Sequence, residues 1–230
     1  MATRPYSLVQ WQEMFRDIYG ERNLPLDPGA IWLHLVEEAG EVAKDFRKEY
    51  YRDLARDLPD VFAWLCAFAN QYGLDLQEVV WEGYPRVCPY CQKAVNCLCI
   101  GQKKVEKDQA ALDNHRRQRA SIPGSLDDWV DMFRDIYGGV NAIQGRAAVG
   151  FHLMEEIGEV ANEILKPNVA RCREEVADVF AWMVGVHIKA QSDQGDDPRS
   201  FSETVWKVFP GTCKVCHARP CLGPDRCVPR

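Results

Sequence analysis

The chain has 230 residues, of which 47% are hydrophobic and 27% are charged, a mixture typical of a globular protein. Its net charge of −6 argues against a general nucleic-acid-binding protein, which would carry a basic surface, so nucleic acid is not an expected partner. No apolar run resembles a signal peptide or reaches the ~18 residues of a membrane span, and we expect a cytoplasmic protein with no membrane partner.

Four helices are predicted in the first hundred residues, where no segment shows the alternation of a strand. Turn-forming residues such as those at 24–29 separate them. The predicted helices are Leu8–Tyr19, Ile31–Tyr51, Asp57–Tyr72 and Asp75–Tyr84.

The second half of the chain repeats the first. Ser7–Gly20 and Ser125–Gly138 share ten of fourteen residues at an offset of 118, and the same offset aligns HLVEEAGEV with HLMEEIGEV and two copies of DVFAW. We therefore expect an all-α fold of two tandem four-helix units that form a pseudo-dimeric bundle. The predicted boundaries are 1–100 for the first unit with its cysteine-rich tail, 101–124 for a linker and 125–230 for the second unit with its tail.

Acidic side chains follow the edge of the apolar face of the second helix in each copy. On a helical wheel, His34, Glu38, Glu41 and Asp45 form this stripe, and Glu37 lies one step closer to solvent. Like charges at this spacing repel by roughly 0.2–0.5 kcal/mol, and partial burial adds to the cost. A divalent cation with oxygen ligands, such as Mg²⁺, would offset the repulsion. The alternative is an ordinary solvated helix face.

The next helix carries a second acidic pair at a spacing of three. The pair is Asp57 and Asp60 in the first copy, and Glu175 and Asp178 in the second. Because the motif occurs twice and on two successive helices, it favours a metal site over a solvated surface.

With these motifs the chain resembles the MazG-like nucleotide pyrophosphohydrolases, an all-α superfamily whose signature is EExxE followed by ExxD. The resemblance implies Mg²⁺-dependent (or Mn²⁺-dependent) hydrolysis of a nucleoside triphosphate between its α and β phosphates, which yields a monophosphate and pyrophosphate. Single-copy members form oligomers, so the tandem chain is either complete by itself or a homo-oligomer. The implied metal ligands are Glu38, Glu41, Asp57, Asp60, Glu156, Glu159, Glu175 and Asp178.

Further roles follow for residues near these acids. Glu37 and Glu155 are the candidates for orienting or deprotonating the attacking water. The substrate-side candidates are His34, Trp64, His152 and Trp182. The histidines would contact phosphate or a metal-bound water, or else form a hydrogen bond at a helix-packing edge, and the tryptophans would stack on a base or pack in the core.

The first copy departs from the signature at Asp57, where the pattern has a glutamate. Pro59 follows two residues later, and proline is tolerated mainly in the first turn of a helix. We therefore expect this helix to begin near Leu58 with Asp57 as its N-cap. An N-capping aspartate would be a poor metal ligand, so the second copy is predicted to hold the better site.

Each copy ends in four closely spaced cysteines. Four thiolates suit tetrahedral Zn²⁺, and short loops of this kind need the metal to fold. Disulfides after oxidation and an iron–sulfur cluster are the alternatives. The predicted zinc ligands are Cys88, Cys91, Cys97 and Cys99 in the first tail, and Cys213, Cys216, Cys221 and Cys227 in the second. Cys66 and Cys172 are predicted to be ordinary buried thiols.

A second class of function stays open beside the hydrolase. The zinc-type tails and the basic stretch at 115–119 are also compatible with a non-catalytic helical module that binds a protein or a nucleic acid. The net acidity and the two nearly complete acidic motifs argue against it.

Overall fold

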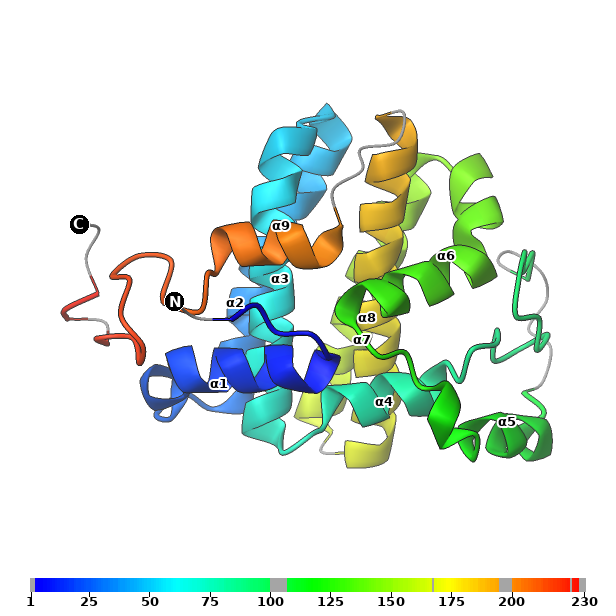
Figure 1. Ribbon diagram of the computed structural model, residues 1–230, viewed down its shortest axis with the longest axis horizontal. Coiled ribbons are helices and arrows are strands. Elements are labelled where there is room, and N and C mark those ends of the chain that lie inside the picture. The colour runs from blue at the N-terminus through cyan, green and yellow to red at the C-terminus, as the bar shows by residue number, and fades with distance from the viewer. Residues whose placement is uncertain (1–2, 100–106, 167, 195–199, 224, 228–230) are drawn as a thin grey trace. The chain divides into compact units, whose positions relative to one another are not determined.

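The computed structural model describes residues 3–99, 107–166, 168–194, 200–223 and 225–227, and its regular elements are all helical (Figure 1). The predicted all-α class is therefore confirmed. The chain divides into two compact units. Unit 1 comprises residues 1–76 and 199–230, and unit 2 comprises residues 77–198.

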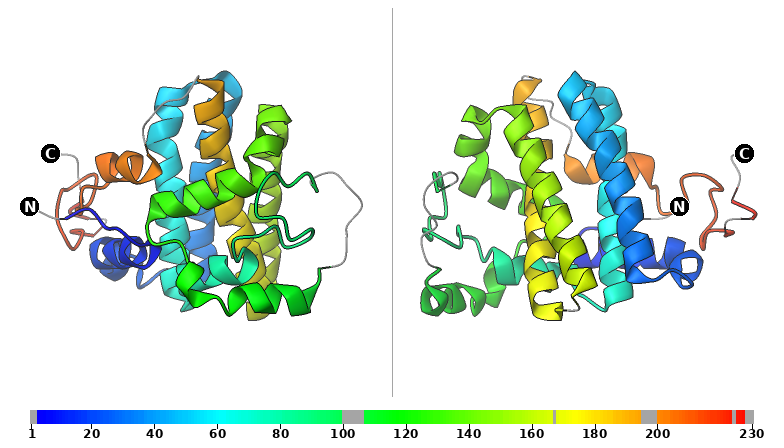
Figure 2. Two further views of the ribbon diagram at one scale, coloured as in Figure 1. Left: turned by 45° about the vertical axis from the view of Figure 1, so that its right-hand side comes forward. Right: turned by 180° about the vertical axis from the view of Figure 1, so that it is seen from behind.

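Unit 1 is built on two long helices, α2 (Pro28–Lys48) and α3 (Tyr51–Tyr72), which lie side by side (Figure 2). Asp27 caps α2 by accepting a hydrogen bond from the backbone N–H of Ala30, and Pro28 occupies the first turn, where its missing N–H costs nothing. Between the helices Glu49 adopts the left-handed conformation, which reverses the chain within two residues.

Two shorter helices cover α3 in this unit. They are α1 (Leu8–Asn23), which begins with a capping box at Ser7, and α9 (Phe201–Val208). Buried aromatic rings join them to α3: the Phe15 and Phe62 rings are 5.8 Å apart, and the Phe62 and Phe201 rings are 5.7 Å apart. The first pair meets edge to face and the second is tilted, and these buried rings belong to the core of unit 1.

Unit 2 repeats this plan. Its long pair is α7 (Arg146–Leu165) and α8 (Val169–Asp193), and α6 (Leu126–Ile143) packs on α8. The other elements are α4 (Leu76–Gly83), α5 (Gln109–Arg116) and a 3₁₀ turn at Arg119–Ser121.

The ends of the two repeats are exchanged between the units. Helix α4 and the first cysteine tail belong by sequence to the first repeat but pack within unit 2, where Trp81 contacts Trp129 of α6 at a ring separation of 6.5 Å. Helix α9 and the second tail pack within unit 1, where Trp206 contacts Trp11 at 6.3 Å. The compact units therefore follow a different division from the repeats at 1–100 and 125–230.

The described part of the expected linker packs on α4. Arg119 pairs with Glu78, and the Trp81 indole donates to the carbonyl of Arg116 at 2.9 Å. Residues 101–106 of that linker lie outside the described residues.

The expected start of α3 near Leu58 is wrong. The helix begins at Tyr51, and Pro59 lies inside it. An interior proline gives up one backbone hydrogen bond and costs ~3 kcal/mol or more. Burial of Leu54 and Leu58 on the apolar face offsets this cost and keeps the turn before Pro59 helical. Asp57 is consequently a buried side chain in the second turn of α3, not an N-cap.

No helix in the described part of the chain is long and apolar enough to cross a membrane.

Candidate functional site

Helices α7 and α8 bring three carboxylates together in unit 2. Glu156 projects from α7, and Glu175 and Asp178 lie one turn apart on α8. Their ligand oxygens are all within 4.8 Å of one another. Glu159, which is more exposed, lies outside this group of three, and its charge adds to the raised pKa of Glu175. We call Glu156, Glu175 and Asp178 the unit 2 acidic cluster.

Burial and mutual repulsion make this cluster electrostatically costly. Burial, reinforced by the charge of Asp178, raises the pKa of Glu156 to about 8. Burial also raises the pKa of Asp178 to about 6, although a hydrogen bond from the Tyr84 hydroxyl at 2.5 Å opposes the rise. The pKa of Glu175 is raised for the same two reasons, burial first, against the opposing charge of Arg171 at 2.7 Å.

The cluster fits a divalent cation of the Mg²⁺ or Mn²⁺ type. Its donors are hard carboxylate oxygens, and they are close enough for small side-chain movements to bring them to one ion at ~2.1 Å. The raised pKa values reflect burial of these carboxyl groups first, and their closeness to one another second. A cation at this position would offset the repulsion between them.

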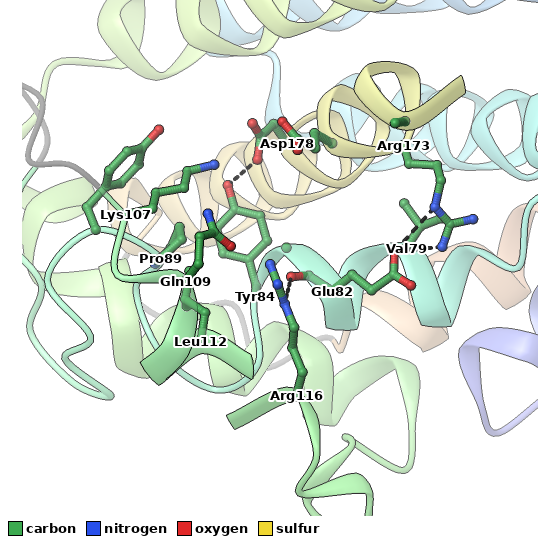
Figure 3. A pocket seen from close by; sticks show the side chains of 14 residues that line it. Val79, Glu82, Tyr84, Pro89, Lys107, Gln109, Leu112, Arg116, Arg173 and Asp178 are labelled. Atoms are coloured by element: carbon green, nitrogen blue, oxygen red, sulfur yellow. Dashed lines mark hydrogen bonds and ion pairs between the residues drawn. The ribbon is translucent and has the colours of Figure 1, made fainter. Parts of the chain in front are cut away.

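A cavity of about 290 Å³ opens beside Asp178 (Figure 3). Its wall carries Lys107, whose side chain extends toward the hydrogen bond between Tyr84 and Asp178 and whose charge lowers the pKa of Asp178. The Lys107 ammonium also lies 5.3 Å from the centre of the Tyr90 ring. The other polar or charged residues that line the cavity are Glu82, Gln109, Arg116, Arg173 and Glu174.

Three of the four equivalent acids of unit 1 are paired with cations of the protein. Asp57 and Asp60 are buried in α3, Glu38 of α2 is half-buried, and Glu41 is exposed. Among the described residues, this set is not one of the groups whose ligand atoms lie within 4.8 Å of each other. Its ion pairs are Lys214 with Asp60 at 2.5 Å, Arg56 with Asp57 at 2.9 Å, and Lys44 with Glu41.

The four predicted substrate-side residues form two matching stacks. His34 lies on Trp64 and His152 lies on Trp182, each pair with ring centres 4.4 Å apart and planes tilted by 12° and 16°. The predicted water-orienting residues extend from these stacks into solvent. Glu37 lies 3.7 Å from the Nδ1 of His34, and Glu155 lies 3.2 Å from the Nδ1 of His152.

Each cysteine tail gathers its four thiols. In both tails the four sulfurs lie within 4.8 Å of one another, and separations of 3.5 Å (Cys91–Cys97), 3.6 Å (Cys213–Cys227) and 3.9 Å (Cys216–Cys221) are measured. A disulfide needs ~2.05 Å, whereas thiolates at ~2.3 Å from a tetrahedral Zn²⁺ are ~3.8 Å apart. The geometry therefore fits a closed four-thiolate metal site in each tail. Cys66 and Cys172 are buried elsewhere, as predicted.

Both tails dock in the same way on their units. The backbone N–H of Cys97 donates to the carbonyl of Ile136 at 2.7 Å, and that of Cys221 donates to Ile18 at 2.7 Å. Ile136 and Ile18 are equivalent positions of the repeat. Each unit therefore has one acidic helix pair and one cysteine tail docked beside it.

Several residues near the acids were not identified from the sequence. Tyr84, Lys107 and Lys214 all come from segments distant in sequence from the acids that they contact or face. A lysine or tyrosine in a tail has no sequence pattern of its own that links it to a particular carboxylate.

The fold and the cluster together define a class of protein, an all-helical scaffold that gathers carboxylates on a pair of long helices in an arrangement that fits a divalent cation. The MazG nucleotide pyrophosphohydrolase domain model matches residues 27–91 and 144–207, more than half of the chain, and the chain belongs to this family. Each match spans one EExxE helix and the following acidic pair. No curated protein and no solved structure gives a significant match.

Proposed function

We propose that unit 2 hydrolyses a nucleoside triphosphate between its α and β phosphates and releases a monophosphate and pyrophosphate. The observation that carries this proposal is the unit 2 acidic cluster beside a cavity with a lysine at its wall. Membership of the MazG family supports the reaction class.

Mg²⁺ or Mn²⁺, when bound, would offset the phosphate charge and provide or position the attacking water. Glu156, Glu175 and Asp178 would hold it. The Tyr84 hydroxyl fixes the orientation of Asp178 by donating to one of its oxygens, which leaves the other carboxylate lone pairs for the ion. Glu159 is the fourth proposed ligand, since its charge acts on Glu156 and Glu175 from the exposed side of α7.

The cavity is the proposed site of the nucleotide. Its volume of about 290 Å³ is just below the ~300–1,000 Å³ typical of small-molecule pockets. Lys107 and Asp178 both line the cavity, and the Lys107 side chain extends toward Asp178, so it would contact phosphate oxygens next to the acidic cluster. Tyr90 offers an aromatic face for the base in the same cavity.

Glu155 is the proposed water-orienting residue of unit 2. It is exposed, adjacent in sequence to Glu156 and within 3.2 Å of His152, whose ring is stacked on Trp182. This stack restricts the imidazole to one plane and so restricts the position of its carboxylate partner. Glu37, His34 and Trp64 repeat the arrangement in unit 1.

Structural zinc in both tails is part of the proposal. The four sulfurs of each tail leave no open coordination position, so these sites hold the tail against its unit and take no part in hydrolysis. Reduced thiols of this kind are typical of a cytoplasmic protein, which is the location that we propose.

The direct test is product analysis with zinc-loaded protein, Mg²⁺ and a panel of ribonucleoside and deoxyribonucleoside triphosphates. We expect monophosphate and pyrophosphate in equal amounts, at a rate that Glu156→Gln abolishes and the matched surface variant Asp131→Asn leaves unchanged. Release of diphosphate and inorganic phosphate would contradict the proposed cleavage site. Absence of turnover would instead favour the non-catalytic zinc-binding module.

A further inference from the structure

The two units differ at the loop between the first two cysteines of each tail. The loop reads CPYC at Cys88–Cys91 in unit 2 and CKVC at Cys213–Cys216 in unit 1. Both loops have the same backbone hydrogen bonds: Cys88 N–H donates to the carbonyl of Lys93, and Cys213 N–H to that of Ala218, each at 2.9 Å. Pro89 and Lys214 therefore occupy equivalent places, so their side chains account for a difference between the two sites.

Lys214 extends from its loop to the acidic residues of unit 1. Its ammonium lies 2.5 Å from a carboxylate oxygen of Asp60, a side chain that is only 8% exposed. The charge of Lys214 also lowers the pKa of Glu38, the acid that faces Asp60 from α2, although burial keeps that pKa raised overall. The Lys214 ammonium also lies over the Phe209 ring, 5.7 Å from its centre. Phe209 stands where unit 2 has Tyr84, so no hydroxyl competes for Asp60 at that position.

The other acids of unit 1 also have cations that unit 2 lacks at the same positions. Arg56, which pairs with Asp57, is replaced by Glu174 in unit 2, and Lys44, which pairs with Glu41, is replaced by Asn162. Unit 2 has an ion pair on its cluster, since Arg171 pairs with Glu175 where unit 1 has Asp53. The charge of Lys107 also acts on Asp178. Lys44, Arg56 and Lys214 thus supply three positive charges to the acids of unit 1, which also include the buried Asp45 beside Lys44. Among the described residues, the cluster of unit 2 has two, from Arg171 and Lys107.

A divalent cation therefore does not fit unit 1 as it fits unit 2. To bind there, it would have to displace an ammonium that is covalently tethered and already hydrogen-bonded to a buried carboxylate. We propose that Lys214 takes the place of a divalent cation in unit 1, so that the chain has a single carboxylate metal site, in unit 2. The unit 1 acids then have a structural role, with Lys214 holding the second tail against α3.

The test is the number of Mn²⁺ ions bound by the full, zinc-loaded chain, counted by the loss of the free-ion electron paramagnetic resonance signal. We expect one Mn²⁺ per chain for the wild type and one more for Lys214→Met, which removes the charge and keeps most of the side-chain volume. Lys214→Arg, which keeps the charge, and Lys207→Met, an exposed lysine of α9, are expected to match the wild type. Two Mn²⁺ on the wild type, or no gain in Lys214→Met, would overturn the proposal.

The reciprocal exchange tests the same idea in unit 2 without depending on Lys214. Pro89→Lys places an ammonium at the equivalent loop position and is expected to lower Mn²⁺ binding by the unit 2 acidic cluster at least tenfold, while Pro89→Ala has no such effect. Equal loss in both variants would show that the loop shape, not the charge, matters, and would contradict the proposal. Zinc content and circular dichroism show that each variant is folded. Turnover is not needed for either readout, so failure of the proposed reaction is separable from failure of this inference.

Discussion

Replacement of Glu156 by glutamine is expected to stabilise the protein when no Mg²⁺ is present. Glu156 has a pKa of about 8 in the fold, against an ordinary value of 4.5, because it is partly buried beside Asp178. A carboxyl group whose pKa is raised by folding favours the folded state at low pH. That contribution is complete below pH 4.5 and is lost as the pH rises toward 8. Glutamine has no charge to lose, so the variant should gain over the wild type across this range.

The size of the gain follows from the shift. At ~1.4 kcal/mol per pKa unit the full shift corresponds to about 5 kcal/mol, but Glu156 is partly exposed and solvent screens its charge. The relevant quantity is the free energy of unfolding of Glu156→Gln minus that of the wild type. We therefore expect this difference to be about 1–2 kcal/mol larger at pH 8 than at pH 5.

This difference is measured by urea denaturation of the zinc-loaded protein at pH 5 and pH 8. No Mg²⁺ is added, and no chelator is used, because it would remove the zinc. Asp131→Asn serves as the control, because Asp131 lies on the exposed face of α6. Added Mg²⁺ should raise the stability of the wild type at pH 8 and leave Glu156→Gln unchanged. If the stability difference between Glu156→Gln and the wild type stays constant or shrinks from pH 5 to pH 8, the electrostatic explanation is refuted.

Three further predictions follow from the contacts of unit 2. Tyr84→Phe removes the donor to Asp178 and is expected to weaken Mn²⁺ binding severalfold in a titration, with the fold unchanged by circular dichroism. Lys107→Ala is expected to raise the KM for triphosphate about tenfold, because one charge-assisted hydrogen bond is lost, and to leave Mn²⁺ binding unchanged. The control is Lys93→Ala, a tail lysine that does not line the cavity, and an equal effect of this variant would contradict the prediction. Cys91→Ser is expected to lower the bound zinc from two ions per chain to one in a colorimetric assay, and unchanged zinc would exclude the four-thiolate site.

The acidic cluster of unit 2 was predictable because its spacing in sequence sets its geometry. Residues three apart on a helix share a face, and the short connection between α7 and α8 makes the two helices neighbours, so Glu156 had to face Glu175 and Asp178. The same reasoning predicts the four-thiol clusters, since the cysteines of each tail are close in sequence. Periodicity likewise predicts the helices, and the duplication was evident from the offset of 118.

The exchange of α4 and α9 between the repeats was not predictable from these patterns. Each helix is amphipathic, and its apolar face fits either copy of a repeated core, so the sequence does not indicate which copy it covers. The contacts that depend on the exchange were therefore missed as well: Lys214 reaches Asp60 across 154 positions, and Tyr84 reaches Asp178 across 94. The start of α3 was predicted wrongly for a different reason. Proline prefers the first turn of a helix, but the burial of Leu54 and Leu58 stabilises helical turns before Pro59.

The most direct test of the account compares triphosphate turnover by Glu156→Gln and Glu38→Gln, two equivalent glutamates of the repeat, at saturating substrate and Mg²⁺. The account predicts that Glu156→Gln loses the release of monophosphate and pyrophosphate, whereas Glu38→Gln retains it, because the carboxylates of unit 2 hold the metal and those of unit 1 are paired with Lys214 and its neighbours. Loss of turnover in Glu38→Gln with activity retained in Glu156→Gln would contradict it.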